Sequence, residues 1–368
     1  MYADRIARFQ PALERSPFDA IALIPGTNLL YLTGLNFHLM ERPVVALFSS
    51  NAVPCFILPE LEQDKLSSCT FEHEAFAYSE DAESRIAAFK KAFAGFAEPA
   101  PKIGVEPFRM RFYEMDVLKQ VCPGIQLSSA DELLSSLRLL KNTSEINAMQ
   151  RAAQVAEKAL LETLTLVRQG ITEKEFESEL TLQLFRAGSD SETAFSPIVA
   201  SGPNSALPHA TPTTRAFTPG DLVIVDWGAK VDGYISDISR TFAISKADPE
   251  LEKIHTIVQA ANAAGREQVR PGNTCAAPDD AARAVIEAAG YGKYFMHRTG
   301  HGIGMEAHEP PYILAGNTRI QEAGMTFTIE PGIYLKGKGG VRIEDDVVVT
   351  VDGHRCLTTL PRELKVIP

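Results

Sequence analysis

The chain has 368 residues, of which 45% are hydrophobic and 23% charged, a composition typical of a globular protein and a length suited to two domains. A formal net charge of −11 argues against nucleic-acid binding, and no apolar run reaches the roughly 20 residues that cross a membrane. Charged residues near the N-terminus also argue against a signal peptide, so we expect a cytoplasmic protein.

The first third of the chain reads as alternating strands and helices. Short apolar or β-branched runs bounded by turn residues predict strands, and apolar positions at helical spacing predict helices. We expect strands at 20–24, 43–48, 52–58 and 102–105, and helices at 84–96, 112–121 and 128–141. These elements predict a mixed α/β domain over residues 1–130, followed by a linker helix over 131–142.

Helix starts are well marked in the remainder of the chain. Asn142 with Glu145, and Thr172 with Glu175, both have the spacing of a capping box. Asp248 precedes a proline, which suits the first turn of a helix. A second domain, 143–368, is therefore predicted to begin with a helix capped by Asn142.

This second domain repeats one layout. Two helices over about 143–187 precede a strand hairpin over about 221–244, and two more helices, over about 249–269 and 279–289, precede a second hairpin over about 326–350. The repetition is one of layout and not of sequence identity. It predicts two similar halves.

Each hairpin carries two acidic residues at mirrored positions. Asp226 and Asp237 are equidistant from the point between Val231 and Asp232, so we expect them to face each other across the first hairpin. Like charges on opposed, apolar-flanked strands are destabilising unless they are protonated or bound to cations. The alternative is a solvated hairpin face with unrelated acids.

The second hairpin has the same feature. Glu330 and Glu344 are equidistant from Gly337, which lies in a glycine-rich turn. This spacing predicts a second pair of facing carboxylates.

Four histidines accompany these carboxylates. His297, His301 and His308 are clustered in HRTGHGIGMEAH, and His209 lies in a loop rich in glycine, proline and serine. Each histidine alone is more commonly a hydrogen-bonded polar residue than a ligand. Together with four carboxylates, they form a mixed nitrogen and oxygen set that suits manganese, iron, cobalt or zinc better than calcium or magnesium.

Four motifs in order resemble the family of prolidase, aminopeptidase P and creatinase, and the similarity extends over essentially the whole chain. They are VDWGAKVDGYISDISRTF, TGHGIGMEAHEPP, TFTIEPGIYL and GVRIEDD. The resemblance implies an α/β (α+β) fold. In this fold, a creatinase-like N-terminal domain precedes a pita-bread catalytic domain with a pseudo-two-fold repeat.

The resemblance also implies the roles of individual residues. The family's five metal ligands correspond to Asp226, Asp237, His301, Glu330 and Glu344. Two divalent ions per subunit are implied, with manganese preferred and cobalt, iron or zinc as alternatives. His209 and His308 are implied to act on the substrate, and His297 and Arg342 to lie beside the ligands. Trp227 departs from the smaller residue common in relatives, and strand alternation predicts that it packs behind the site.

The implied activity is hydrolysis of Xaa-Pro peptide bonds, with Glu330 moving a proton to the leaving nitrogen. We favour a dipeptidase, whose substrate is a proline-containing dipeptide, over an aminopeptidase acting on short peptides. The deciding cation is expected in the N-terminal domain, at 38–42, and a homodimer is implied. Three roles fit the motifs less well: a methionine aminopeptidase, a hydrolase of a small non-peptide amide, and a binding protein that reuses the fold.

Overall fold

The computed structural model of the protein describes residues 2–96, 100–167 and 170–367. The described chain forms two compact units, one ending at Leu137 and the next beginning at Arg138. The chain passes from one to the other within helix α5 (Asp131–Leu139). The end points of the predicted domains, residues 1 and 368, lie outside the described residues.

The N-terminal unit is built on a six-stranded mixed sheet in the order β4-β3-β2-β1-β5-β6. Its strands are β1 (Ala20–Leu23), β2 (Val45–Ser49), β3 (Cys55–Pro59), β4 (Glu74–Tyr78), β5 (Lys102–Val105) and β6 (Gln126–Ser129). Its helices are α1 (Tyr2–Glu14), α2 (Thr27–Thr33), α3 (Ala82–Phe93) and α4 (Phe112–Val121). Apolar residues of α3 and α4 pack on the sheet around Phe89 and Ile103.

The elements predicted for this unit are present, and the strands predicted at 43–48 and 52–58 correspond to β2 and β3, which pair antiparallel. One boundary was wrong. The helix expected to begin at residue 128 begins instead at Asp131, because Ser128 and Ser129 belong to β6 and pair with β5. The Ser129 hydroxyl then accepts a hydrogen bond from the Asp131 backbone N–H, where the helix starts. The elements α1, α2, β4 and β6 were not predicted.

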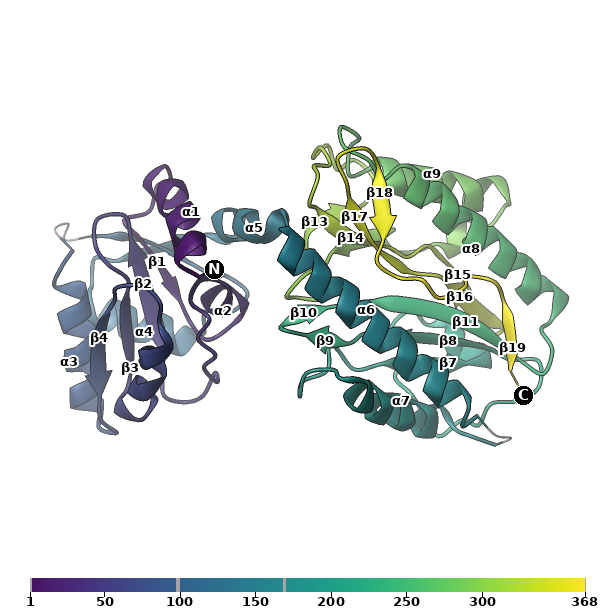
Figure 1. Ribbon diagram of the computed structural model, residues 1–368, viewed down its shortest axis with the longest axis horizontal. Helices are drawn as coiled ribbons and strands as arrows, with labels where there is room; N and C mark the ends of the chain where they lie inside the picture. Colours follow the sequence, from purple (N-terminus) through teal and green to yellow (C-terminus); the bar gives the residue numbers. More distant parts are fainter. Residues whose placement is uncertain (1, 97–99, 168–169, 368) are drawn as a thin grey trace. The chain divides into compact units, whose positions relative to one another are not determined.

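The C-terminal unit has the predicted repeated layout, as Figure 1 shows. Helices α6 (Thr143–Leu164) and α7 (Glu173–Ala187) precede a four-stranded sheet in the order β19-β11-β8-β7. Helices α8 (Pro249–Glu267) and α9 (Ala277–Ala288) precede a five-stranded sheet in the order β13-β12-β14-β17-β18. Two small ladders, β9 with β10 and β15 with β16, complete the unit.

The strands of the first half are β7 (Ile198–Ser201), β8 (Leu222–Trp227), β9 (Lys230–Val231), β10 (Tyr234–Ile235), β11 (Ile238–Ile244) and, from the chain end, β19 (Lys365–Ile367). Those of the second half are β12 (Gly300–Gly302), β13 (Glu309–Ile313), β14 (Thr326–Ile329), β15 (Gly332–Leu335), β16 (Gly339–Arg342), β17 (Asp345–Val349) and β18 (His354–Cys356).

The predicted helix starts are confirmed at the level of single hydrogen bonds. Both capping boxes form, at Asn142 with Glu145 and at Thr172 with Glu175. Asp248 caps α8 through the backbone N–H of Glu250. No helix among the described residues is long and apolar enough to cross a lipid bilayer.

Strand alternation decides which side chains point into the space between the two halves. Val223, Val225 and Trp227 of β8 pack against α6 and α7, whereas Leu222 packs against α8. Asp226 alternates with Val225 and Trp227 and so points away from α6 and α7.

Candidate active site

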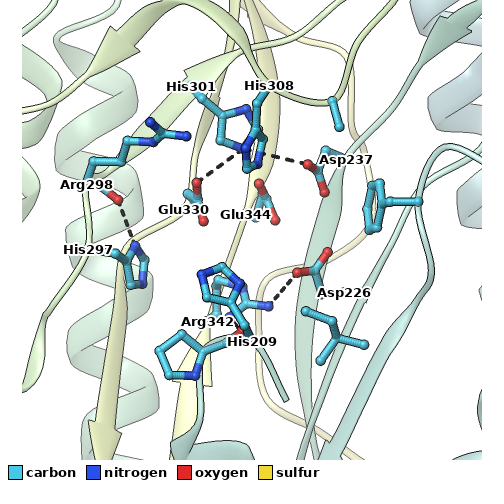
Figure 2. A pocket seen from close by; sticks show the side chains of 14 residues that line it. His209, Asp226, Asp237, His297, Arg298, His301, His308, Glu330, Arg342 and Glu344 are labelled. Atoms are coloured by element: carbon cyan, nitrogen blue, oxygen red, sulfur yellow. Dashed lines mark hydrogen bonds and ion pairs between the residues drawn. The ribbon is translucent and has the colours of Figure 1, made fainter. Parts of the chain in front are cut away.

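A cavity of about 550 Å³ opens between the two halves of the C-terminal unit. Figure 2 shows its polar side chains converging from strands of both sheets. All of the site residues predicted from the sequence line it. The lining residues are Phe195, Ile198, Pro208, His209, Asp226, Asp237, His297, Arg298, His301, Ala307, His308, Glu330, Arg342 and Glu344.

The register of the first hairpin differs from the prediction by two residues. Asp226 pairs with Ser239, and Asp237 lies just before the start of β11. The cause is the turn, because Asp232 and Gly233 both have positive φ (53° and 80°), as in the two-residue type I′ turn. Val231 therefore pairs with Tyr234, which moves the centre of the hairpin to the Asp232–Gly233 bond.

The register of the second hairpin is confirmed. Ile329 pairs with Asp345 and Gly332 with Arg342, and both pairs are centred on Gly337. Glu330 and Glu344 occupy the opposed positions where the hairpin opens. The Glu344 N–H donates across to the carbonyl of Ser239 in β11, so this opening joins the two halves.

Asp237, His301 and Glu344 bring one ligand atom each within 4.8 Å of one another, and all three side chains are buried. The His301 Nε2 atom lies 3.4 Å from Glu330 Oε1 and 3.8 Å from Asp237 Oδ2. Its Nδ1 atom lies 3.2 Å from the carbonyl oxygen of Gly302. A proton on Nδ1 satisfies that carbonyl and leaves the Nε2 lone pair facing the carboxylates, which is the arrangement of a metal-binding histidine.

These carboxylates are electrostatically unfavourable without a cation. Burial, with the charge of Glu344, raises the pKa of Asp237 well above its usual value. Burial, with the charge of Glu330, does the same to the pKa of Glu344. Burial raises the pKa of Glu330 itself to about 7 and lowers the pKa of His301 well below its usual value. The pocket therefore favours a neutral imidazole beside carboxylates that need positive charge.

Two carboxylate oxygens show directly that the site fits metal ions. Asp226 Oδ1 and Asp237 Oδ1 are buried, and neither has a hydrogen-bond partner among the described residues. A buried, unsatisfied carboxylate oxygen is costly, and coordination to a cation removes that cost. The donor set of carboxylate oxygens and one imidazole nitrogen suits divalent transition metals.

Arg342 organises the side of the cavity that holds Asp226. It is buried, and its Nη2 donates to Asp226 Oδ2 at 2.5 Å while its Nε donates to the hydroxyl of Ser239 at 2.9 Å. The Ser239 hydroxyl donates in turn to Glu344 Oε2 at 2.8 Å. The Arg342 Nη1 also donates to the carbonyl oxygen of Pro208. Arg342 thus orients carboxylates from both hairpins.

The other three histidines have different surroundings. His297 is half-buried, and burial lowers its pKa to about 4, so its ring is neutral. Its Nδ1 lies 2.7 Å from the carbonyl of Arg298, and its Nε2 lies 2.9 Å from the hydroxyl of Tyr334, which also accepts from Arg342. His209 and His308 are exposed on the cavity surface, and the centre of the His308 ring lies 4.0 Å from that of His301.

Arg298 was not predicted as a site residue. Its guanidinium lies 4.5 Å from the centre of the Tyr312 ring, and its charge helps to lower the pKa of His308 after burial, the larger cause. Among the described residues it has no carboxylate within ion-pair distance, whereas Arg342 is paired with Asp226. The position of Arg298 next to His297 in the sequence is the feature that could have identified it as a site residue. Ser239 and Tyr334 were also missed, although Ser239 follows Asp237 by two residues.

Trp227 lies where the sequence predicts it, behind the site. The side chain is fully buried, and its indole N–H donates to the carbonyl oxygen of Ala156 in α6 at 2.8 Å. It does not line the cavity.

Comparison with known proteins covers both units. Residues 147–351 match Metallopeptidase family M24, and residues 5–140 match the Creatinase/Prolidase N-terminal domain. A Xaa-Pro dipeptidase from Lactobacillus delbrueckii subsp. lactis is 34% identical over 98% of this chain and 98% of that protein.

Solved structures are similar over the whole length. A dipeptidase from Pyrococcus horikoshii OT3 has a TM-score of 0.93 and 38% identity, covering 99% of this chain and 100% of that one. A prolidase from Thermococcus sibiricus has a TM-score of 0.94 and 35% identity, covering 100% and 99%.

Proposed function

Because the chain belongs to metallopeptidase family M24, we propose that it is a Xaa-Pro dipeptidase that uses two divalent metal ions per subunit. Family membership makes the protein a hydrolase that uses divalent metal. It also confirms the expected fold, a creatinase-like N-terminal domain followed by a pita-bread catalytic domain.

One observation carries the proposal. Two opened hairpins and β12 direct Asp226, Asp237, His301, Glu330 and Glu344 into one cavity, where two buried carboxylate oxygens have no hydrogen-bond partner in the described part of the chain. Four carboxylates balance the charge of two divalent ions, with His301 neutral. We therefore propose these five residues as the ligands that would hold the two ions. Manganese is the preferred metal, with cobalt, iron or zinc as alternatives.

Bound metal ions would supply Lewis acidity, activating water and polarising the scissile carbonyl. The protein supplies the rest. Glu330 is half-buried at the edge of the cluster, so its carboxylate can take a proton from the attacking water and deliver it to the leaving nitrogen. His308 and His209, on the cavity surface, can donate hydrogen bonds to the developing oxyanion or hold the substrate.

The nitrogen of a Xaa-Pro bond belongs to a tertiary amide and has no N–H to donate. It becomes a good leaving group only when it receives a proton, which is the role proposed for Glu330. Apolar side chains also line the cavity, including those of Phe195, Ile198 and Ala307, and they offer contacts for the pyrrolidine ring and the preceding side chain.

Arg298 favours a dipeptide over a longer peptide. A dipeptide places its C-terminal carboxylate close to the scissile bond, and a cavity that binds it needs an available cation. Arg342 is ion-paired with Asp226, but Arg298 lines the cavity without a carboxylate partner among the described residues. Stacking on Tyr312 holds its planar guanidinium, whose geometry matches a carboxylate.

The N-terminal segment 38–42 remains a predicted contributor. Residues 38–41 are exposed within their unit, and Arg42 pairs there with Glu80 at 2.6 Å. Participation of this segment from a partner subunit, the homodimer and the cytoplasmic location stay predictions.

The decisive experiment compares Ala-Pro, the amide Ala-Pro-NH2 and Ala-Pro-Ala as substrates of the manganese-loaded protein, with Glu330→Gln as the inactive control. We expect cleavage of Ala-Pro and poor cleavage of the amide, which lacks the carboxylate. Cleavage of the tripeptide at a rate comparable to that of the dipeptide would make the protein a Xaa-Pro aminopeptidase instead. If the protein binds metal but cleaves none of the three compounds, the peptidase proposal is refuted and a small non-peptide amide becomes the leading substrate.

The role of Arg298 has its own control. Arg298→Met removes the charge, so KM for Ala-Pro should rise by tenfold or more, since a hydrogen bond to a charged group contributes about 1.5–3 kcal/mol. KM for the amide should change little. Arg298→Lys keeps the charge without the planar fork and should be intermediate. Equal effects on both substrates would contradict carboxylate binding by Arg298.

A further inference from the structure

The loop that carries His209 is held by a buried carboxylate that does not line the cavity. Glu173 is the first residue of α7 and is completely buried. Ser201 donates to its Oε1 from both the backbone N–H and the hydroxyl, each at 2.7 Å. Thr213 donates to its Oε2 from the backbone N–H at 2.9 Å and from the hydroxyl at 2.6 Å. The Glu173 carboxylate thus accepts hydrogen bonds from both ends of segment 201–213.

Further hydrogen bonds join the same loop to Glu173 and to the first turn of α7. The side-chain amide of Asn204 donates to Glu173 Oε1 at 3.1 Å. The first N–H groups of α7, those of Glu173 and Lys174, donate to the carbonyls of Arg215 and Thr213. Free helix N–H groups and a buried carboxylate are therefore both satisfied by this one loop.

The loop directs N–H and O–H donors at Glu173, so it favours the ionised form of that carboxylate. Burial by itself would raise the pKa of Glu173, but the hydrogen bonds from Thr213 and Ser201 outweigh it and lower the pKa below its usual value. Glu173→Gln would replace one acceptor oxygen by an NH2 group, which is itself a donor and would face the donors of the loop.

Segment 201–213 is tightly packed at its start, where only glycine fits. Gly202 has a φ of +50°, and a Cβ there would lie 2.4 Å from Asp221 Oδ1 and 2.6 Å from Arg215 Nη2. Arg215 makes a two-pronged ion pair with Asp221 and also donates to the Ser201 hydroxyl. The hydroxyl of Ser201 therefore connects this ion pair to Glu173.

On the cavity side, the segment meets the proposed catalytic machinery. Arg342 donates to the carbonyl of Pro208, the residue before His209, at 3.1 Å, and the Gly340 N–H donates to the hydroxyl of Ser205 at 2.8 Å. Between these contacts and Thr213, His209 stands exposed on the cavity surface. Its position depends on where the ends of the segment are held.

We propose that Glu173 is the positioning residue for His209, acting through the ends of segment 201–213 and without touching the substrate. The proposal rests on the proposed function, in which His209 contacts the substrate. Misplacement of a reacting group by about 1 Å can cost roughly 100-fold in rate. Glu173→Asp withdraws the carboxylate by one carbon–carbon bond, about 1.5 Å, and so tests placement while keeping the charge.

A matched control is available in the same unit. Glu157 of α6 is also buried and also binds a loop end, accepting from the Thr359 N–H and hydroxyl and from the Leu360 N–H. That loop carries no residue of the cavity. Glu157→Gln should therefore reproduce the loss of stability that accompanies Glu173→Gln without its effect on catalysis.

The test measures kcat and KM on Ala-Pro for the manganese-loaded native protein, Glu173→Gln, Glu173→Asp, His209→Ala, Glu173→Gln/His209→Ala and Glu157→Gln. Because the role proposed for Glu173 is to place His209, we expect Glu173→Gln to lower kcat/KM by about 10- to 100-fold, with the same division between kcat and KM as His209→Ala. The double variant should be no worse than His209→Ala. Multiplication of the two single effects, or equal losses in Glu157→Gln, would overturn the proposal.

Hydrogen–deuterium exchange gives a readout that does not need activity. Amides of segment 201–213 should exchange faster in Glu173→Gln than in the native protein, whereas Glu157→Gln should leave them unchanged. Unchanged exchange in Glu173→Gln would refute anchoring by this residue. Inactivity of the native protein towards every peptide would instead refute the proposed function, and with it the catalytic role of Glu173, while exchange would still report the anchoring.

Discussion

Glu330 should stabilise the fold when metal is bound and destabilise it when metal is removed. In the metal-free protein, burial raises the pKa of Glu330 from 4.5 to about 7. A carboxyl whose pKa is higher in the folded state favours folding when protonated, so this group penalises the fold increasingly as pH rises from 4.5 through 7. Glu330→Gln removes the titration and should stabilise the chelated protein at neutral and alkaline pH.

The magnitude follows from the shift. One pKa unit corresponds to about 1.4 kcal/mol, so the ionised Glu330 costs the metal-free fold about 3 kcal/mol above pH 7, and roughly 2–3 kcal/mol of that appears between pH 5 and pH 8. Glu330 also raises the pKa of Asp237 and of Glu344, so its removal relieves those groups in the same direction.

Urea unfolding of the chelated native protein and of Glu330→Gln at pH 5 and pH 8 measures this difference. Comparison of the two proteins cancels the contributions of titrating groups outside the cavity, such as His255, whose pKa is lowered to about 4 by burial. Glu322→Gln, at an exposed position, is the control. With manganese bound, the native protein should be the more stable of the two, because Glu330→Gln lacks a metal ligand. A stability difference that does not change between pH 5 and pH 8 would refute this electrostatic reasoning.

Three further outcomes are expected. Manganese at a hundred times its Kd should stabilise the protein by about 2.7 kcal/mol for each ion bound, measured in thermal unfolding, and a chelator should abolish the gain. A melting temperature independent of metal would contradict the proposed site. Trp227→Phe removes the indole N–H bond to the Ala156 carbonyl and part of a fully buried ring, so it should lower the free energy of unfolding by about 1–3 kcal/mol with kcat/KM unchanged. A large loss of activity would place Trp227 in the substrate site. Asp345→Asn should cost about 3–5 kcal/mol at pH 7, because it leaves the buried Arg240 and the nearby Arg362 without their carboxylate. Since Arg240 and Arg362 outweigh burial and lower the pKa of Asp345, its contribution should fade as the pH drops below 3.8, and urea unfolding at pH 3 and pH 7 checks this.

Local pattern was sufficient where one short segment carries the whole cause. The capping boxes at Asn142 and Thr172 depend on a side chain and a backbone three residues away, and both form as predicted. The pairing of Glu330 and Glu344 about Gly337 was predictable for the same reason, because a hairpin register is determined by its own turn.

The first hairpin shows the limit of that reasoning. Symmetry of Asp226 and Asp237 suggested direct opposition, but the backbone conformation of Asp232 and Gly233 moved the register so that Asp226 faces Ser239. Asp237 nevertheless reaches the cluster, because its ligand atom needs proximity to Glu344 and His301 and not to Asp226 across a ladder. The residues that carry the chemistry were therefore predictable by type and order, while the geometry of the first hairpin was not.

Residue types and their order indicated the carboxylate and histidine set, because chemistry of this kind needs particular donors that are few in the chain. Which cations are already paired depends on contacts between segments distant in sequence. Arg342 meets Asp226 across 116 positions, and Glu173 meets Thr213 across 40, so no local pattern could show that one is an organiser and the other an anchor. Tertiary folding alone decided that Arg298 lines the cavity without a carboxylate partner among the described residues, since this depends on every acidic side chain that the fold brings near it.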